Sequence, residues 1–266
     1  KIMRPVDGSF IKKQITRFQT VFAADGGMWP RWIAGALLML ISLMAACGTS
    51  TPVAAASPTI PAPTITVTPI DQTISTTDHA TFGGTLYGHG STALILSNQV
   101  ENQSTEWGDV PTQFASRGYA VLTYQYRDTT DDTTRLADLR AAITFMQQQG
   151  AQKIVLMGAS IGGLVTTAVA TQTHVQAIVL LSAPDAYGTI LLTATQVQQI
   201  TAPALIVESD EDEFVPDAQQ IYDWLKSPKI LKIYANDDSH GVMLFDNHDD
   251  LFPYIWQFLH QHAATP

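Results

Sequence analysis

From residue 71 to the C-terminus the sequence predicts one α/β domain, a doubly wound, mostly parallel sheet with helices on both faces. Short runs that are apolar throughout, such as 93–97 and 177–181, are typical of parallel strands buried on both faces. They alternate with segments in which apolar residues recur every three or four positions, as in amphipathic helices. Only 22 residues, 182–203, separate two of these runs, so no large helical lid is expected.

The strands and helices of this domain are expected to follow one another closely. The first two strands are Thr-rich, and the later ones are apolar and β-branched. Gly118 and Gly150 come directly after two helical segments, as glycine often does because it adopts left-handed backbone angles easily. The expected strands are 73–76, 81–87, 93–97, 119–124, 153–157, 177–181, 204–207 and 230–234. The expected helices are 106–117, 135–149, 161–171, 217–225 and 251–262.

Residues 1–47 are predicted to be the n-region and signal peptide of a lipoprotein. The apolar stretch 32–46 has 15 residues, whereas a membrane-spanning helix needs about 20. Ala45 and Ala46 precede Cys47, the only cysteine, as in a lipoprotein processing box, although Met44 stands where such boxes usually carry Leu. We therefore expect an exported protein, anchored on the extracytoplasmic face of a membrane by lipid on Cys47. An uncleaved signal anchor and a buried apolar helix are the alternatives, and the role of residues 1–27 stays open.

The segment 48–70 and the domain 71–266 differ sharply in composition. Residues 48–70 carry no charge and are rich in Thr, Pro and Ala, which favours an extended tether that cannot bury a core. From residue 71 onward there are 8 basic and 22 acidic side chains, a net charge of −14. Such an acidic domain repels phosphate backbones, so no nucleic-acid partner is expected.

A candidate nucleophile lies between a predicted strand and a predicted helix, in the segment 158–163, Gly-Ala-Ser-Ile-Gly-Gly. In this setting Gly-x-Ser-x-Gly forms a tight turn that exposes the serine, here Ser160. Side chains at Gly158 and Gly162 would collide in such a turn, which explains the glycines. The alternative is that Ser160 only caps the helix.

A serine nucleophile needs a general base and a carboxylate that orients the base. Asp212, four residues before Pro216 in an acidic loop after a strand, is the expected acid, with Asp210 and Glu208 as alternatives. His240 follows the last strand in a loop of small residues and is the expected base; His248 is the runner-up. The acidic cluster 246–250 around His248 could instead hold a metal, but nothing in it specifies ligand geometry.

With these motifs, the stretch 73–258 resembles the small, lidless α/β-hydrolases of the dienelactone-hydrolase and serine-esterase type. The resemblance implies a triad of Ser160, Asp212 and His240, and an oxyanion hole made by the backbone N–H groups of Gln99 and Ile161. Two features depart from the family pattern. Asn98-Gln99 stands where members often carry His-Gly, and the Arg-Gly-x-Gly-x-Ser loop is replaced by the segment 126–129.

The expected function is hydrolysis of a carboxylic ester or related acyl bond through an acyl-enzyme, without metal or organic cofactor. Amidase, thioesterase or acyltransferase chemistry on the same triad is an alternative, as is a non-catalytic binding lipoprotein that keeps the fold. Dehalogenase and epoxide-hydrolase chemistry would need Asp in place of Ser160. Because the acid and base loops are rich in carboxylates, we expect a neutral or cationic acyl substrate. No protein partner is predicted.

Overall fold

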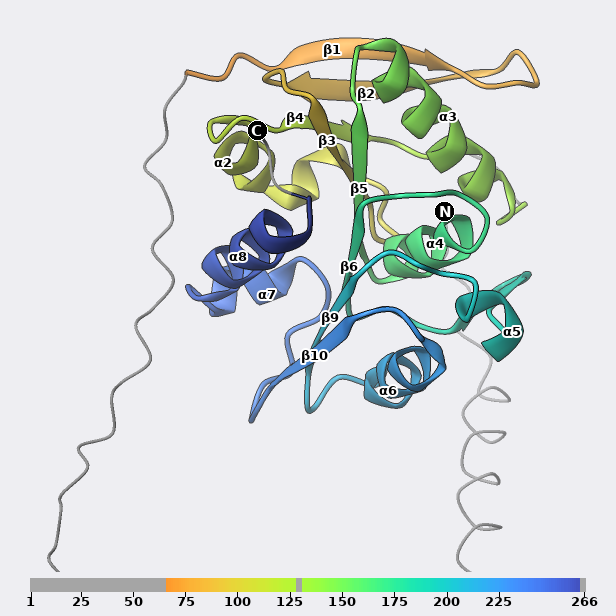
Figure 1. Ribbon diagram of the computed structural model, residues 1–266, viewed down its shortest axis with the longest axis vertical. Coiled ribbons are helices and arrows are strands. Elements are labelled where there is room, and N and C mark those ends of the chain that lie inside the picture. The colour runs from red at the N-terminus through yellow and green to blue at the C-terminus, as the bar shows by residue number, and fades with distance from the viewer. Residues whose placement is uncertain (1–65, 128–130, 264–266) are drawn as a thin grey trace, which may run out of the picture. The chain divides into compact units, whose positions relative to one another are not determined.

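A computed structural model describes residues 66–127 and 131–263 (Figure 1). Its main sheet has eight strands in the order β1-β2-β4-β3-β5-β6-β9-β10, and β7 and β8 form a separate two-stranded hairpin. The strands are β1 (Ile70–Ser75), β2 (Thr81–Tyr87), β3 (Thr92–Ser97), β4 (Ala120–Tyr124), β5 (Lys153–Ala159), β6 (Ala177–Leu181), β7 (Ala186–Tyr187), β8 (Ile190–Leu191), β9 (Ala204–Ser209) and β10 (Lys229–Tyr234). The predicted fold class is confirmed.

The sheet is parallel except at one end. β1 pairs antiparallel with β2, and β2 pairs antiparallel with β4. All pairs from β4 to β10 are parallel. The carboxyl ends of these parallel strands therefore meet at one edge, where α/β proteins commonly place their sites.

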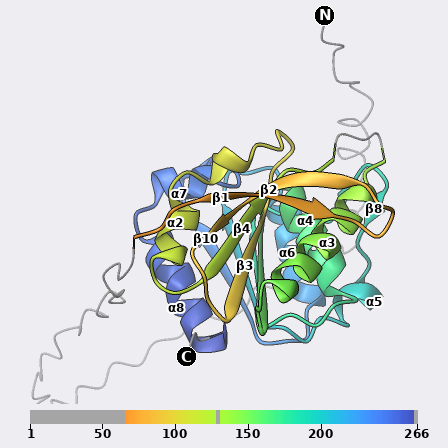
Figure 2. The same ribbon diagram turned by 90° about the horizontal axis from the view of Figure 1, so that it is seen from above.

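Helices cover both faces of the sheet (Figure 2). In β5, Ile154 and Leu156 belong to a core shared with α3, α4 and α6, whereas Val155 and Met157 belong to a core shared with α2 and α8. This alternation explains why the strand is apolar throughout. The helices are η1 (Ser104–Trp107), α2 (Val110–Ala115), α3 (Thr134–Gln148), α4 (Ile161–Ala170), α5 (Ala194–Val197), α6 (Val215–Trp224), α7 (Met243–Asn247) and α8 (Leu251–Ala263).

One predicted helix is wrong in detail. Residues 106–117 do not form one helix. The first two of them are the end of η1, Val110–Ala115 forms α2, and Gly108 lies between the two helices at φ 54° and ψ −124°. These angles interrupt the helix, and Pro111 in the first turn of α2 has no N–H to continue the earlier turn. Gly118 and Gly150 have φ of 94° and 98°, the left-handed angles expected after a helix.

The predicted signal peptide, with Cys47, lies outside the described residues, as does most of the predicted linker. In the part of the chain that the structure describes, no helix is long and apolar enough to span a membrane. The first strand begins at Ile70, one residue before the predicted start of the domain.

Candidate active site

Ser160 lies at the turn between β5 and α4, with φ 52° and ψ −123°. A side chain on Gly158 would place its Cβ 2.1 Å from the carbonyl oxygen of Gly162. A side chain on Gly162 would place its Cβ 2.1 Å from the carbonyl oxygen of Ser97, at the end of β3. The turn therefore excludes side chains at both positions and brings the start of α4 against β3. Strained angles at a non-glycine residue are typical of functional turns.

Asp212 and His240 form a direct pair. His240 Nδ1 lies 2.7 Å from Asp212 Oδ2, and the N–H of Phe214 donates to Asp212 Oδ1 at 3.0 Å. Burial alone would raise the pKa of the Asp212 carboxyl, but the hydrogen bonds from His240 and Phe214 outweigh it and hold that pKa below its ordinary value. The Asp212 side chain is 3% exposed and that of His240 is 33% exposed, so the pair reaches from the interior to the surface.

The loop that carries His240 rests on the turn that carries Ser160. The N–H of Gly241 donates to Ser182 Oγ at 2.9 Å, and a Cβ on Gly241 would lie 3.4 Å from the Cβ of Ala159. Gly241 directly follows His240, and Ala159 directly precedes Ser160, so these contacts place the base loop against the Ser160 turn. Among the described residues, Ser160 Oγ and His240 make no direct hydrogen bond, a contact that often tightens only when substrate binds.

The two alternative acids and the alternative base occupy other positions. Asp210 is exposed and accepts from the Asp237 N–H at 3.2 Å, whereas Glu208 is buried within β9. His248 Nε2 lies 2.7 Å from Asp237 Oδ2, and its ring stacks on Tyr234 with centroids 3.5 Å apart. His248 thus has its own carboxylate and ties the base loop to the end of β10.

Metal binding at the acidic cluster 246–250 finds no geometric support. Within residues 66–127 and 131–263, no group of three or more His, Cys, Asp or Glu side chains is arranged to hold a metal ion. In that cluster, the Tyr234 hydroxyl donates to Asp250 Oδ1 at 2.9 Å, and Lys232 Nζ lies 3.2 Å from Asp250 Oδ2. These contacts hold α8 to β10.

The two backbone N–H groups expected to form the oxyanion hole differ in their hydrogen-bond acceptors. Ile161 is the first residue of α4, so its N–H has no acceptor within the helix. The N–H of Gln99 donates to Glu106 Oε1 at 2.5 Å, so a carboxylate holds the group that the sequence assigns to the oxyanion. The assignment of Gln99 stays a prediction.

Glu106 is a site residue that the sequence analysis missed. Burial raises the pKa of its carboxyl, and its second oxygen, Oε2, is buried without a hydrogen-bond partner. Its neighbour Trp107 donates from Nε1 to Asn98 Oδ1 at 3.0 Å, and Asn98 Nδ2 donates to the Tyr124 carbonyl at 2.6 Å. Asn98, which stands where members of the resembled family often carry His, thus joins β3, β4 and η1. The sequence signal that could have indicated Glu106 was its position seven residues after Gln99, the predicted backbone donor.

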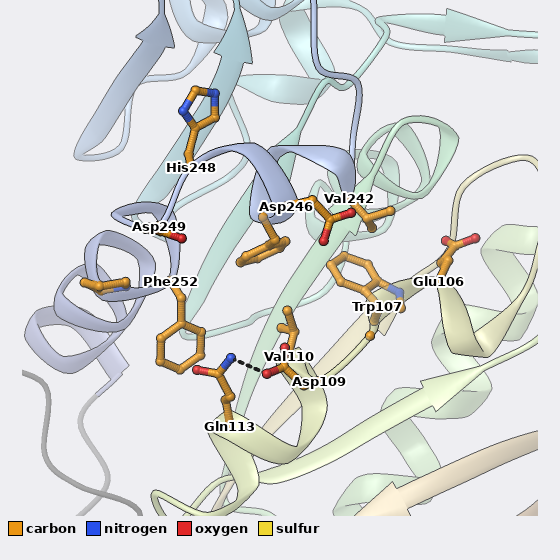
Figure 3. Close-up of a pocket in the computed structure, with 13 residues that line it drawn as sticks. Glu106, Trp107, Asp109, Val110, Gln113, Val242, Asp246, His248, Asp249 and Phe252 are labelled. Atoms are coloured by element: carbon orange, nitrogen blue, oxygen red, sulfur yellow. Dashed lines mark hydrogen bonds between the residues drawn. The ribbon is translucent and has the colours of Figure 1, made fainter. Parts of the chain in front are cut away.

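A cavity of about 260 Å³ lies beside Glu106 (Figure 3). Side chains of η1 and α2 face those of α7, α8 and Val242 across it. Val242 also donates its N–H to Gln99 Oε1 at 3.1 Å, which connects the cavity wall to the base loop. The lining is aromatic and acidic and includes Trp107, Phe245, Phe252, Glu106, Asp109, Asp246 and Asp249.

A match to a known sequence family identifies the family of this chain. Residues 85–264, more than half of the chain, match the model described as "Alpha/beta hydrolase family". The chain belongs to the α/β-hydrolase family. No curated protein sequence matches it.

Solved structures similar to this hydrolase share its fold at low identity. An esterase from Pyrococcus furiosus aligns with a TM-score of 0.64 and 16% identity, covering 73% of this chain and 90% of that one. The α/β-hydrolase GrgF from Penicillium sp. aligns at 0.65 and 18%, covering 73% and 99%. A putative dienelactone hydrolase from Klebsiella pneumoniae aligns at 0.61 and 14%, covering 74% and 98%. At these identities the likeness shows the fold alone.

Proposed function

We propose that this hydrolase cleaves carboxylic esters through an acyl-enzyme on Ser160, with His240 as general base and Asp212 as its orienting acid. The observation that carries the proposal is the hydrogen-bonded Asp212–His240 pair held by Gly241 against the strained Ser160 turn. A nucleophile, a base and an orienting carboxylate in this order are the parts that acyl transfer requires.

In the proposed reaction, Ser160 Oγ attacks the acyl carbon while His240 Nε2 takes the hydroxyl proton. Asp212 accepts from Nδ1, which keeps the other ring nitrogen free to act as the base. His240 then returns the proton to the leaving alcohol, and a water molecule releases the acid by the same steps in reverse. The N–H of Ile161 is one proposed oxyanion donor; the N–H of Gln99 is the other, once the substrate oxygen displaces Glu106.

The carboxylates around the site support a preference for neutral or cationic acyl substrates. Glu106, Asp109, Asp246 and Asp249 line the cavity beside the base loop, which Ser160, Asp212 and His240 do not line, so an anionic substrate that approaches along this cavity meets like charge. The same triad could serve amide, thioester or acyl-transfer chemistry, and the choice of ester rests on fold likeness to esterases. We further propose that lipid on Cys47 anchors the hydrolase to the extracytoplasmic face of a membrane.

A binding protein without turnover is the second candidate, favoured by the Glu106 carboxylate on the Gln99 N–H. Labelling with a fluorophosphonate probe, followed by mass mapping of the adduct, separates the two. We expect the adduct on Ser160, no adduct in Ser160→Ala, and a loss of p-nitrophenyl acetate turnover of about 10³-fold or more in that variant. Ser75→Ala, an exposed serine on β1, is the matched control and should label normally. Absence of labelling in the wild type would favour the binding protein.

A further inference from the structure

Behind the proposed acid lies a second carboxyl group. Glu208 is the fifth residue of β9, and none of its surface is exposed. Among the described residues, neither Oε1 nor Oε2 has a hydrogen-bond partner, so a carboxylate there would be poorly stabilised. A buried charge without donors is very costly, and such a group stays neutral instead.

The side chains that act on Glu208 all belong to the proposed site. They are the Asp212 carboxyl and the Ser182 hydroxyl. Asp212 already accepts from His240 and from the Phe214 N–H, so its anion is stabilised and that of Glu208 is not. When two adjacent carboxyls compete in this way, the one with donors ionises and the other keeps its proton. Burial, together with the charge on Asp212, accordingly raises the pKa of the Glu208 carboxyl from 4.5 to about 8.

Within the described ranges, Asp212 is the charged side chain that acts on Glu208, and the neighbouring elements can be taken in turn. Its register partner on β10 is Ile233, and on the β6 side the adjacent residue is Ser182. Helix α4 carries no ionisable side chain. On α6, the carboxyl of Asp217 accepts from the Asp185 N–H at 3.3 Å.

We propose that Glu208 is a positioning residue, a neutral carboxylic acid that donates its hydrogen bond to the Asp212 carboxylate and so holds the acid that orients His240. Ser182 completes the arrangement, because its Oγ accepts from the Gly241 N–H and its own proton is free for either carboxyl. The acid loop and the base loop are thereby joined on both sides of the Asp212–His240 pair. The inference rests on the proposed function.

Two substitutions separate positioning from simple filling of space. Glu208→Gln keeps a donor for Asp212 and cannot ionise, so at pH 7 its kcat should stay within about threefold of the wild type. Glu208→Leu fills the site without a donor, and its kcat should fall at least tenfold with KM unchanged, since a hydrogen bond to a charged group is worth about that factor. Glu211→Gln removes an exposed carboxylate from the same loop and should behave as the wild type.

The pH profile gives a readout that packing alone would not change. The wild-type kcat should fall between pH 7 and 9 as Glu208 ionises and its hydrogen bond is lost, whereas Glu208→Gln should be flat there. Equal falls in both proteins, or wild-type kcat in Glu208→Leu, would overturn the positioning role.

A measurement without catalysis keeps this test distinct from that of the proposed function. In Ser160→Ala protein with ¹³C-labelled Glu carboxyls, one resonance should titrate near pH 8 and disappear when Glu208→Gln is added. If every Glu carboxyl titrates below pH 6, the neutral acid is refuted whatever the enzyme does. If that resonance is found but no ester is turned over, the positioning role falls together with the proposed function.

Discussion

Replacing Glu208 with Gln should stabilise the protein increasingly as the pH rises. The pKa of Glu208 rises from 4.5 to about 8 on folding, so between these values the folded state binds a proton that the unfolded state has released. Stability from this group is therefore complete below pH 4.5 and is lost as the pH rises to about 8. Each pKa unit corresponds to about 1.4 kcal/mol, so the wild type loses about 3 kcal/mol of unfolding free energy between pH 5 and pH 7.5. Gln loses none.

Urea unfolding of both proteins at pH 5 and at pH 7.5 measures this difference. The advantage of Glu208→Gln should be about 3 kcal/mol larger at the higher pH. Other titrating groups, such as Asp217 with a pKa of about 6, contribute equally to both proteins and cancel. Glu211→Gln, which removes an exposed carboxylate from the same loop, is the control for the change in net charge. A difference that changes by less than about 1 kcal/mol would refute the buried, neutral Glu208.

Three further predictions concern the site and the anchor. Glu106→Leu removes the acceptor that holds the Gln99 N–H, so kcat/KM for a neutral ester should rise, by about tenfold if that hydrogen bond competes with the oxyanion; a fall measured in the same assay would exclude competition. The preference for a neutral over a matched anionic ester should shrink between 0.05 and 0.5 M NaCl, because salt screens exposed charges, and a salt-independent ratio would contradict repulsion by the carboxylates around the site. Cys47→Ser should abolish incorporation of labelled palmitate in a bacterial host, and the lipoprotein hypothesis is wrong if the variant still incorporates the label.

The sequence predicted the parts of the fold that depend on burial and on backbone sterics. Apolar runs located β3, β4, β5, β6 and β9, because strands covered on both faces must be apolar throughout, and the predicted strand 230–234 agrees with the edge strand β10. Gly158 and Gly162 were predictable because a side chain at either position would meet a carbonyl oxygen at 2.1 Å. Both signals are local, so one sequence suffices to read them.

Short elements and side-chain directions could not be read in this way. The strands of the β7–β8 hairpin have two residues each and α7 has five, too few to show a period. The contact between Glu106 and the Gln99 N–H depends on how η1 turns at Gly108, which composition does not reveal. Glu208, Asp210 and Asp212 were close alternatives because they lie at the end of β9 and in the loop that follows it, and only the fold decides which one reaches His240.

What distinguishes the three carboxyl groups at this site is the supply of donors rather than the residue type. Asp212 accepts two hydrogen bonds, Glu106 accepts one from the Gln99 N–H and leaves one oxygen unpartnered, and Glu208 accepts none. The directions of their pKa shifts agree with this supply, since the pKa of Asp212 is lowered and burial raises those of Glu106 and Glu208. In the proposed acyl transfer, one full negative charge beside His240 would be enough to stabilise the imidazolium. A second would stabilise it further and hinder the return of its proton to the leaving group, so a neutral Glu208 allows Asp212 to be firmly held without doubling the charge.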